Sequence, residues 1–93
     1  MDTQNYAKNA ESAILAGLPR QKIVVGAKQL RKALDSGRVR QVYLARNADP
    51  AITEPIEALC RQSRVEYFWI RSMQDLGKAC GIEVGAAAAA VVN

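Results

Sequence analysis

The stretch IVVGAKQLRK, residues 23–32, passes from a strand pattern to a helix pattern at a single glycine. The run from Lys22 to Val25 is rich in β-branched residues, which is typical of a short buried strand. After Gly26, apolar residues recur at helical spacing and share one face: Ala27, Leu30, Ala33 and Leu34. The stretch therefore predicts a strand followed directly by an amphipathic helix, and Gly37 is expected to end that helix.

The same alternation of strand and helix patterns continues along the chain. Residues 39–45 and 65–70 are strand-like, and a helix N-cap pattern follows each run, first Asp49 with Pro50 and then Ser72 with Asp75. The apolar stripes of these two helices, expected to face the core, are Ile52, Ile56, Leu59 and Cys60 in the first and Leu76, Ala79 and Cys80 in the second. Such regular alternation predicts an α/β layered fold with a parallel or mixed sheet.

Residues 85–92 fit two structures, because they contain a run of alanines followed by Val91 and Val92. Alanine has the highest helix propensity. The small side chains and the two valines suit equally well a buried strand that a helix approaches closely. Both alternatives stay open on this pattern.

The length of 93 residues favours one domain spanning residues 1–93. Residues 1–20 are expected to form a polar lead-in and a short amphipathic helix, and residues 22–93 the core. The apolar run at 85–92 is much shorter than the roughly 20 residues of a membrane-spanning helix, and the first residues lack a secretory signal pattern. We therefore expect a cytoplasmic protein with no membrane contact.

The residue content argues against most enzymes and metal proteins. The chain has no histidine, the commonest general base and metal ligand, and 2 cysteines. Cys60 and Cys80 lie on apolar stripes and are expected to be buried small hydrophobic residues. We expect no catalytic residue, no cofactor and no metal site.

The distribution of charge points to a polyanionic partner. Lys and Arg number 13 against 9 Asp and Glu, a net charge of +4, and many of the cations crowd one third of the chain. These clustered cations are Lys28, Arg31, Lys32, Arg38, Arg40 and Arg46. A helix start offers free N–H groups to anions, and Lys28 and Gln29 are side chains that can read base edges beside it. The alternative, that this is only a solvated helix face, has about equal weight.

A second candidate feature is the glycine-bounded loop near the end of the chain. Ile82 and Val84 flank Glu83 there, and exposed aliphatic side chains on such a loop suit an unstacked base. The simpler interpretation, which the residues alone favour, is that Ile82 and Val84 point into the core. The aromatic residues of the preceding strand, Tyr67, Phe68 and Trp69, are also expected in the core.

Three segments together resemble one family. Residues 23–29, residues 45–50 and residues 76–84 have the order and spacing of the kink-turn RNA-binding ribosomal proteins, which include the archaeal large-subunit protein seven-Ae and small bacterial ribosomal-protein-like members. The resemblance covers residues 22–93. It implies a three-layer α/β/α sandwich with a mixed, mainly four-stranded sheet, and it favours a strand for the alanine-rich segment.

The resemblance also implies a function, the binding of an RNA duplex that bends sharply at a bulge followed by tandem sheared G·A pairs. The first residues of the helix after Gly26 would face the guanine edges. The glycine-bounded loop with Ile82 and Val84, the apolar loop, would cover the flipped-out bulge nucleotide. Asp49 matches an acidic position that contacts RNA or orients basic residues. The residues expected at the RNA are Gly26, Ala27, Lys28, Gln29, Arg31, Lys32, Arg46, Asp49, Met73, Ile82, Glu83, Val84 and Gly85.

Some of these positions differ from the family pattern. Lys28 and Gln29 stand where Asn-Glu is usual, Met73 stands at a frequently basic position, and Val84-Gly85 replaces a basic residue and a proline. We expect weaker discrimination of guanine and one fewer phosphate contact.

The expected partner is a structured RNA, such as a kink-turn in ribosomal RNA or a riboswitch-like element, with no DNA, and the protein is expected to be a monomer associated with the ribosome. The alternative is a protein–protein interaction module on the same fold, in which Ile82 and Val84 would contact a protein.

Overall fold

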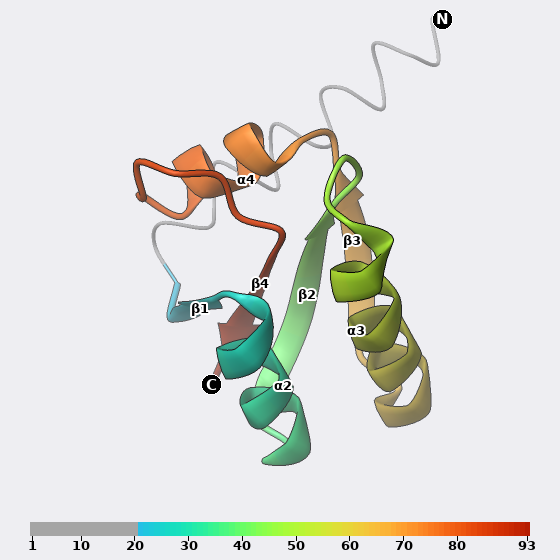
Figure 1. The fold of residues 1–93 in the computed structure, drawn as a ribbon. Coiled ribbons are helices and arrows are strands. Elements are labelled where there is room, and N and C mark those ends of the chain that lie inside the picture. The colour runs from blue at the N-terminus through green and yellow to red at the C-terminus, as the bar shows by residue number, and fades with distance from the viewer. Residues whose placement is uncertain (1–20) are drawn as a thin grey trace, which may run out of the picture.

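The computed structural model describes residues 21–93, in which strands and helices alternate (Figure 1). The helix expected within residues 1–20 lies outside the described residues. The elements are β1 (Ile23–Val25), α2 (Ala27–Asp35), β2 (Val39–Ala45), α3 (Pro50–Ser63), β3 (Glu66–Ile70), α4 (Met73–Ala79) and β4 (Ala88–Val92). The strands and helices predicted between residues 22 and 81 are present within about two residues of their expected bounds, and the undecided segment 85–92 contains strand β4. None of these helices has the length and apolar character needed to cross a membrane.

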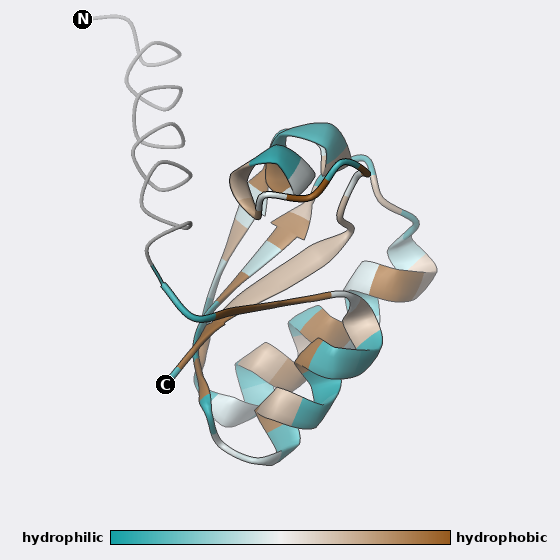
Figure 2. Ribbon diagram, turned by 90° about the vertical axis from the view of Figure 1, so that its left-hand side faces the viewer, coloured by the Kyte–Doolittle hydropathy of each residue, from teal (hydrophilic) through white to brown (hydrophobic). Residues whose placement is uncertain are grey.

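The strands form one mixed sheet in the order β1-β4-β2-β3. β2 and β3 are parallel, and β4 runs antiparallel to both of its neighbours. Helices α2 and α3 cover one face of the sheet and α4 lies against the other (Figure 2). The predicted α/β/α sandwich with a mixed four-stranded sheet is confirmed.

The alanine-rich segment is a central strand of this sheet. Ala88 and Ala90 face the α2 and α3 side, while Ala89 and Val91 face the α4 side. All four side chains are buried. Pairing with β1 on one edge and β2 on the other satisfies both edges of β4, and the small side chains let helices pack closely on both faces. The sheet position therefore outweighs the helix propensity of alanine.

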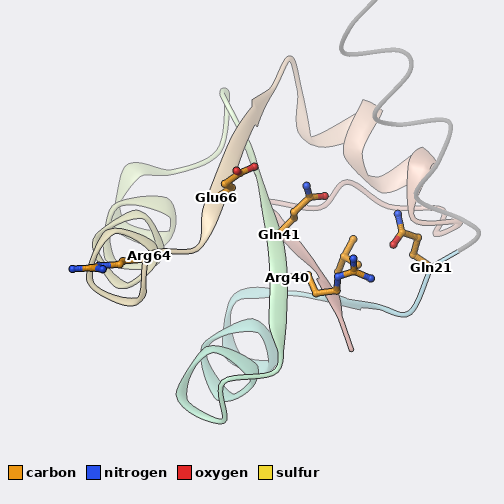
Figure 3. A pocket seen from close by; sticks show the side chains of 6 residues that line it. Gln21, Arg40, Gln41, Arg64 and Glu66 are labelled. Carbon is orange, nitrogen blue, oxygen red and sulfur yellow. The ribbon is translucent and has the colours of Figure 1, made fainter.

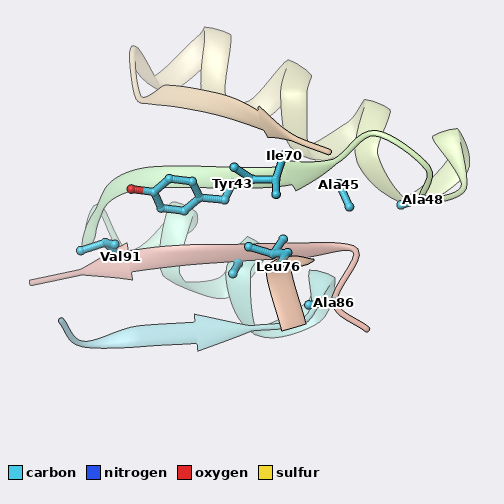
Figure 4. Packing of buried hydrophobic residues seen from close by; sticks show 8 residues of the cluster. Tyr43, Ala45, Ala48, Ile70, Leu76, Ala86 and Val91 are labelled. Carbon is cyan, nitrogen blue, oxygen red and sulfur yellow. The ribbon is translucent and has the colours of Figure 1, made fainter. Parts of the chain in front are cut away.

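Two apolar clusters hold the layers together. On the α4 side, Leu76 packs with Tyr43, Ile70 and Val91 (Figure 4), and the rings of Tyr43 and Phe68 are stacked with centroids 5.7 Å apart. On the other side, the cluster consists of Leu30, Leu34, Val42, Leu44, Ile56, Cys60, Ala88 and Ala90. The sheet therefore separates two apolar cores, because helices pack on both of its faces.

Three expectations about the core need correction. Ile52 was expected on the inward stripe of α3 but is 41% exposed, because the helix turns Thr53 rather than Ile52 toward the core in its first turn. Tyr67, Phe68 and Trp69 pack against the core clusters as expected but stay half-buried, since β3 is an edge strand of the sheet. Among the thiols, Cys60 is fully buried as predicted, whereas Cys80 at the end of α4 is half-buried.

The predicted helix caps are confirmed. Asp49 accepts a hydrogen bond at Oδ1 from the N–H of Ala51 at 2.9 Å, with Pro50 at the first helical position. Ser72 accepts at Oγ from the N–H of Asp75 at 3.1 Å. These caps fix where α3 and α4 begin, and both helices begin at the same edge of the sheet.

Candidate functional site

Four segments of the chain meet at one edge of the sheet, which we call the site edge: residues 26–29, 46–49, 71–73 and 82–87. They meet because β1, β2 and β3 end there while β4 begins there. Backbone hydrogen bonds join them: Gly26 N–H to Ala88 O at 3.0 Å, Ala45 N–H to Ala87 O at 2.9 Å, and Arg46 N–H to Ile70 O at 2.8 Å. The three motifs recognised in the sequence are therefore adjacent in space.

The start of α2 is open to an anion. Gly26 is the N-cap residue with φ of +99° and ψ of 145°, a conformation that glycine adopts readily and other residues rarely adopt. No side chain caps the helix, and its first turn carries no acidic residue. A Cβ placed on Gly26 would meet nothing within 4 Å, so the outer side of this turn is unobstructed. The N–H groups of the first turn and the positive end of the helix dipole thus face open space.

Polar side chains surround this helix start. Lys28, Gln29, Arg31 and Lys32 are all exposed, while Leu30 on the opposite face is fully buried. None of the four side chains forms an ion pair or a hydrogen bond with the described part of the chain. A ligand could therefore reach them without breaking a contact to any of residues 21–93.

The two aliphatic side chains of the apolar loop, residues 82–85, differ in burial. Ile82 is half-buried against the α4-side cluster, as the core interpretation predicted. Val84 is 70% exposed, so the same interpretation is wrong for this residue. The reason is the loop backbone: the Val84 carbonyl lies directly over Gly77, whose own position is buried, and this contact turns the Val84 side chain outward.

Further contacts hold the apolar loop against α4. Ile82 N–H donates to Gly77 O at 3.0 Å, and Ala86 N–H donates to Met73 O at 2.9 Å. A Cβ on Gly85 would lie 3.0 Å from the Cβ of Met73, so this glycine is in close contact with the helix start. The loop is therefore supported at both ends, and Val84 projects from a fixed base.

The remaining predicted residues lie at the same edge in different roles. Arg46 and Asp49 are exposed at the end of β2 and the start of α3. Met73 is half-buried as the first residue of α4, and Glu83 and Gly85 are exposed in the apolar loop. The site edge thus contains the predicted residues except Arg31 and Lys32, which lie farther along α2.

Two residues that support the loops of the site edge were not singled out from the sequence. Asn47 accepts a hydrogen bond at Oδ1 from the N–H of Met73 at 2.8 Å, and Gly77 makes room for the Val84 carbonyl. Both lie inside recognised motifs. A glycine in the middle of an otherwise ordinary helix was the available signal for Gly77.

The polar hollow in Figure 3 is separate from the site edge. It has a volume of about 510 Å³ and is lined by Gln21, Arg40, Gln41, Arg64, Glu66 and Val91. Gln41 and Glu66 lie near the first residues of β2 and β3, opposite the edge where these strands end. Within residues 21–93 no group of three or more Cys, Asp or Glu side chains is arranged to hold a metal ion.

Comparison with known proteins agrees with this geometry. Residues 8–93 match the family described as Ribosomal protein L7Ae/L30e/S12e/Gadd45. The chain belongs to this family. The resemblance noted from the three motifs is confirmed, and the L7Ae family and the similar proteins below are non-enzymatic.

Relatives of the chain in the L7Ae family include small bacterial proteins. An RNA-binding protein of Bacillus pumilus (strain SAFR-032) is 46% identical over 72 residues, which are 77% of this chain and 88% of that protein. RNA-binding protein YbxF of Geobacillus stearothermophilus is 44% identical over 72 residues, with the same coverage of 77% and 88%. Among solved structures, the Giardia lamblia 15.5kD RNA binding protein superposes with a TM-score of 0.79 at 30% identity, covering 91% of this chain and 73% of that one.

Proposed function

We propose that this protein binds RNA, and that its target is a kink-turn held at the site edge. One observation carries the proposal: an open helix start with exposed polar side chains lies beside a supported loop that exposes Val84. The names of the relatives support RNA as the partner, because the proteins of Bacillus pumilus and Giardia lamblia are both called RNA-binding proteins.

In this proposal the start of α2 recognises the sheared G·A pairs. Lys28 donates to the O6 and N7 acceptors of guanine, and the Gln29 amide both donates and accepts at a base edge. The N–H groups after Gly26 face a phosphate. The exposed cations Arg31, Lys32 and Arg46 contact the RNA backbone, which adds affinity without reading sequence.

The apolar loop covers the flipped-out bulge nucleotide. Val84 provides an exposed aliphatic surface, Ile82 supports it from below, and Glu83 and Asp49 offer acceptors to the exposed base edge. Met73 supplies no charge, so its contribution is its backbone contact with the loop rather than a phosphate contact.

The mechanism is a shift of the RNA conformational equilibrium. Guanine edges and an extruded nucleotide lie close together only in the bent RNA, so only that form contacts α2 and the apolar loop at once. A protein can shift an equilibrium only by its differential affinity for the two forms. Moving an RNA from about 1% to about 99% bent requires roughly 10⁴-fold tighter binding of the bent form.

We further propose that the protein acts as a single-domain monomer in the cytoplasm, in association with ribosomal RNA. Co-sedimentation with ribosomal subunits tests the association, and the molar mass in solution tests the monomer. A protein found only in the ribosome-free fractions would direct the search to a riboswitch-like RNA.

A pair of lysine variants tests the proposed RNA contacts. Lys28→Ala is expected to weaken kink-turn binding by about 1–3 kcal/mol, because Lys28 reads a base edge. Lys22→Ala is the matched control. It removes the same charge at the residue just before β1, at the opposite edge of the sheet from the site edge. Both are titrated at one fixed salt concentration, because phosphate contacts make affinity strongly salt-dependent.

Equal effects of the two variants would contradict a specific helix contact. Loss of all RNA affinity above salt-sensitive background, with a protein partner that depends on Val84, would favour the protein–protein interaction module instead.

A further inference from the structure

Asn47 joins two loops that are far apart in the sequence. Its Oδ1 accepts a hydrogen bond from the backbone N–H of Met73 at 2.8 Å, across 26 residues of chain. Met73 is the first residue of α4, so its N–H has no acceptor inside the helix. Asn47 supplies that acceptor from the loop between β2 and α3.

Met73 in turn holds the apolar loop. Its carbonyl accepts from the N–H of Ala86 at 2.9 Å, immediately after the loop ends. The Met73 side chain fills the space next to Gly85, where an added Cβ would lie at 3.0 Å. A movement of the Met73 backbone therefore moves the attachment point of the loop that carries Val84.

We infer that Asn47 is a positioning residue for the apolar loop, acting through the backbone of Met73. Asn47 is exposed and lies outside the loop, so its effect on Val84 is transmitted rather than direct. The consequence for RNA rests on the proposed function: Asn47 sets the distance between the start of α2 and the base-covering surface of Val84.

A carboxylate at position 47 retains this role. Asp has the same length as Asn and keeps an acceptor oxygen, and a negative charge is favourable at the start of α4. Asn47→Ala removes the acceptor, whereas Asn47→Asp preserves it. The comparison of the two variants separates the hydrogen bond from the bulk of the side chain.

The first test uses the RNA-free protein and amide hydrogen exchange. In Asn47→Ala, the Met73 and Ala86 amides are expected to exchange about fivefold faster or more, in line with the loss of one hydrogen bond. Asn47→Asp should restore the exchange rates of the parent protein. Gln62→Ala shortens an exposed amide side chain near the end of α3, outside both loops; it is the matched control and should leave both rates unchanged.

Unchanged Ala86 exchange in a folded Asn47→Ala variant would overturn the inference, as would failure of Asn47→Asp to restore it. Should Asn47→Ala not fold, the scalar coupling across the Asn47–Met73 hydrogen bond in the parent protein decides. A detectable coupling, together with parent-like exchange rates in Asn47→Asp, supports the inference. Absence of the coupling overturns the inference.

The second test measures kink-turn affinity for Asn47→Ala, Val84→Ser and the double variant. If Asn47 acts through the loop, both substitutions impair the same RNA contact, that of Val84. The affinity of the double variant should then be within about twofold of the affinity of whichever single variant binds less tightly. Fully multiplicative losses would overturn the link to Val84. If no variant or parent protein binds the RNA, the proposed function fails while the exchange result still decides the role of Asn47.

Discussion

Gly77 offers the sharpest test of how α4 supports the apolar loop. Replacing Gly77 with alanine would place a methyl group on the Val84 carbonyl oxygen and 3.1 Å from both the Gly85 Cα and the Val84 carbonyl carbon. Ordinary van der Waals contacts of a Cβ lie at 3.4–4 Å. All three neighbours are backbone atoms, so no side-chain rotation relieves the overlap, and the loop itself must move.

The expected cost follows from two opposing effects. Because the overlap is with backbone atoms, the cost lies in the upper part of the range for overpacking, about 2–3 kcal/mol, and the higher helix propensity of alanine returns about 1 kcal/mol. A net loss of about 1–2 kcal/mol lowers the unfolding temperature of a domain this size by roughly 4–15 °C. Thermal and urea unfolding of Gly77→Ala, monitored by circular dichroism, measure this loss directly.

Gln74→Ala is the matched control for this experiment. Gln74 is exposed on the same helix, and such surface substitutions change stability by about 0.5 kcal/mol or less. A Gly77→Ala protein that unfolds at or above the temperature of the parent protein would refute the packing argument.

Three other perturbations have definite outcomes. Asp49→Ala should lower the free energy of unfolding by about 1 kcal/mol through loss of the α3 cap; urea titration against Asp49→Asn, which keeps an acceptor, measures it, and equal losses in both would contradict the cap. Burial, with a smaller contribution from Glu57, raises the pKa of Cys60 from 9.0 to about 11. The folded protein thus keeps a proton that the unfolded chain releases, so this contribution to stability is complete below pH 9 and is lost as pH rises towards about 11. Urea titrations across that range should show a shallower decline for Cys60→Ala, and identical declines would count against the shift. Val84→Ser should weaken kink-turn binding about tenfold through loss of buried apolar area, with the unfolding temperature unchanged; unchanged affinity would remove Val84 from the interface.

Much of the fold was predictable because the local signals act over short distances. Asp49 with Pro50 and Ser72 with Asp75 fix two helix starts through hydrogen bonds within three residues. The alanine run was undecided, because its strand depends on two neighbours that are distant in the sequence. Only the sheet order shows that β4 lies between β1 and β2.

The site was predictable in its residues but not in their orientation. Val84 and Ile82 are two residues apart in one loop, yet one is 70% exposed and the other half-buried. This difference arises from the contact of the Val84 carbonyl with Gly77, which no periodicity encodes. The role of Asn47 was also invisible in the sequence, because its partner Met73 lies 26 residues away along the chain.

Ile52 illustrates the limit of helical periodicity. Its spacing from Ile56 places it on the inward stripe, but a helix buries a side chain only where another element lies opposite. The buried stripe of α3 consists of Thr53, Ile56 and Cys60, and Ile52 lies beside it with 41% of its surface exposed.

The bending of a labelled RNA tests the central claim most directly. A kink-turn RNA with a donor and an acceptor dye on its two helix ends is titrated with the protein at fixed moderate salt. The control is the same RNA with its sheared G·A pairs converted to Watson–Crick pairs. If the site edge recognises the bent form, energy transfer should rise to saturation for the first RNA and stay unchanged for the second. Binding of both RNAs with equal affinity and no change in energy transfer would contradict the account and leave the α2 surface as a nonspecific polyanion contact.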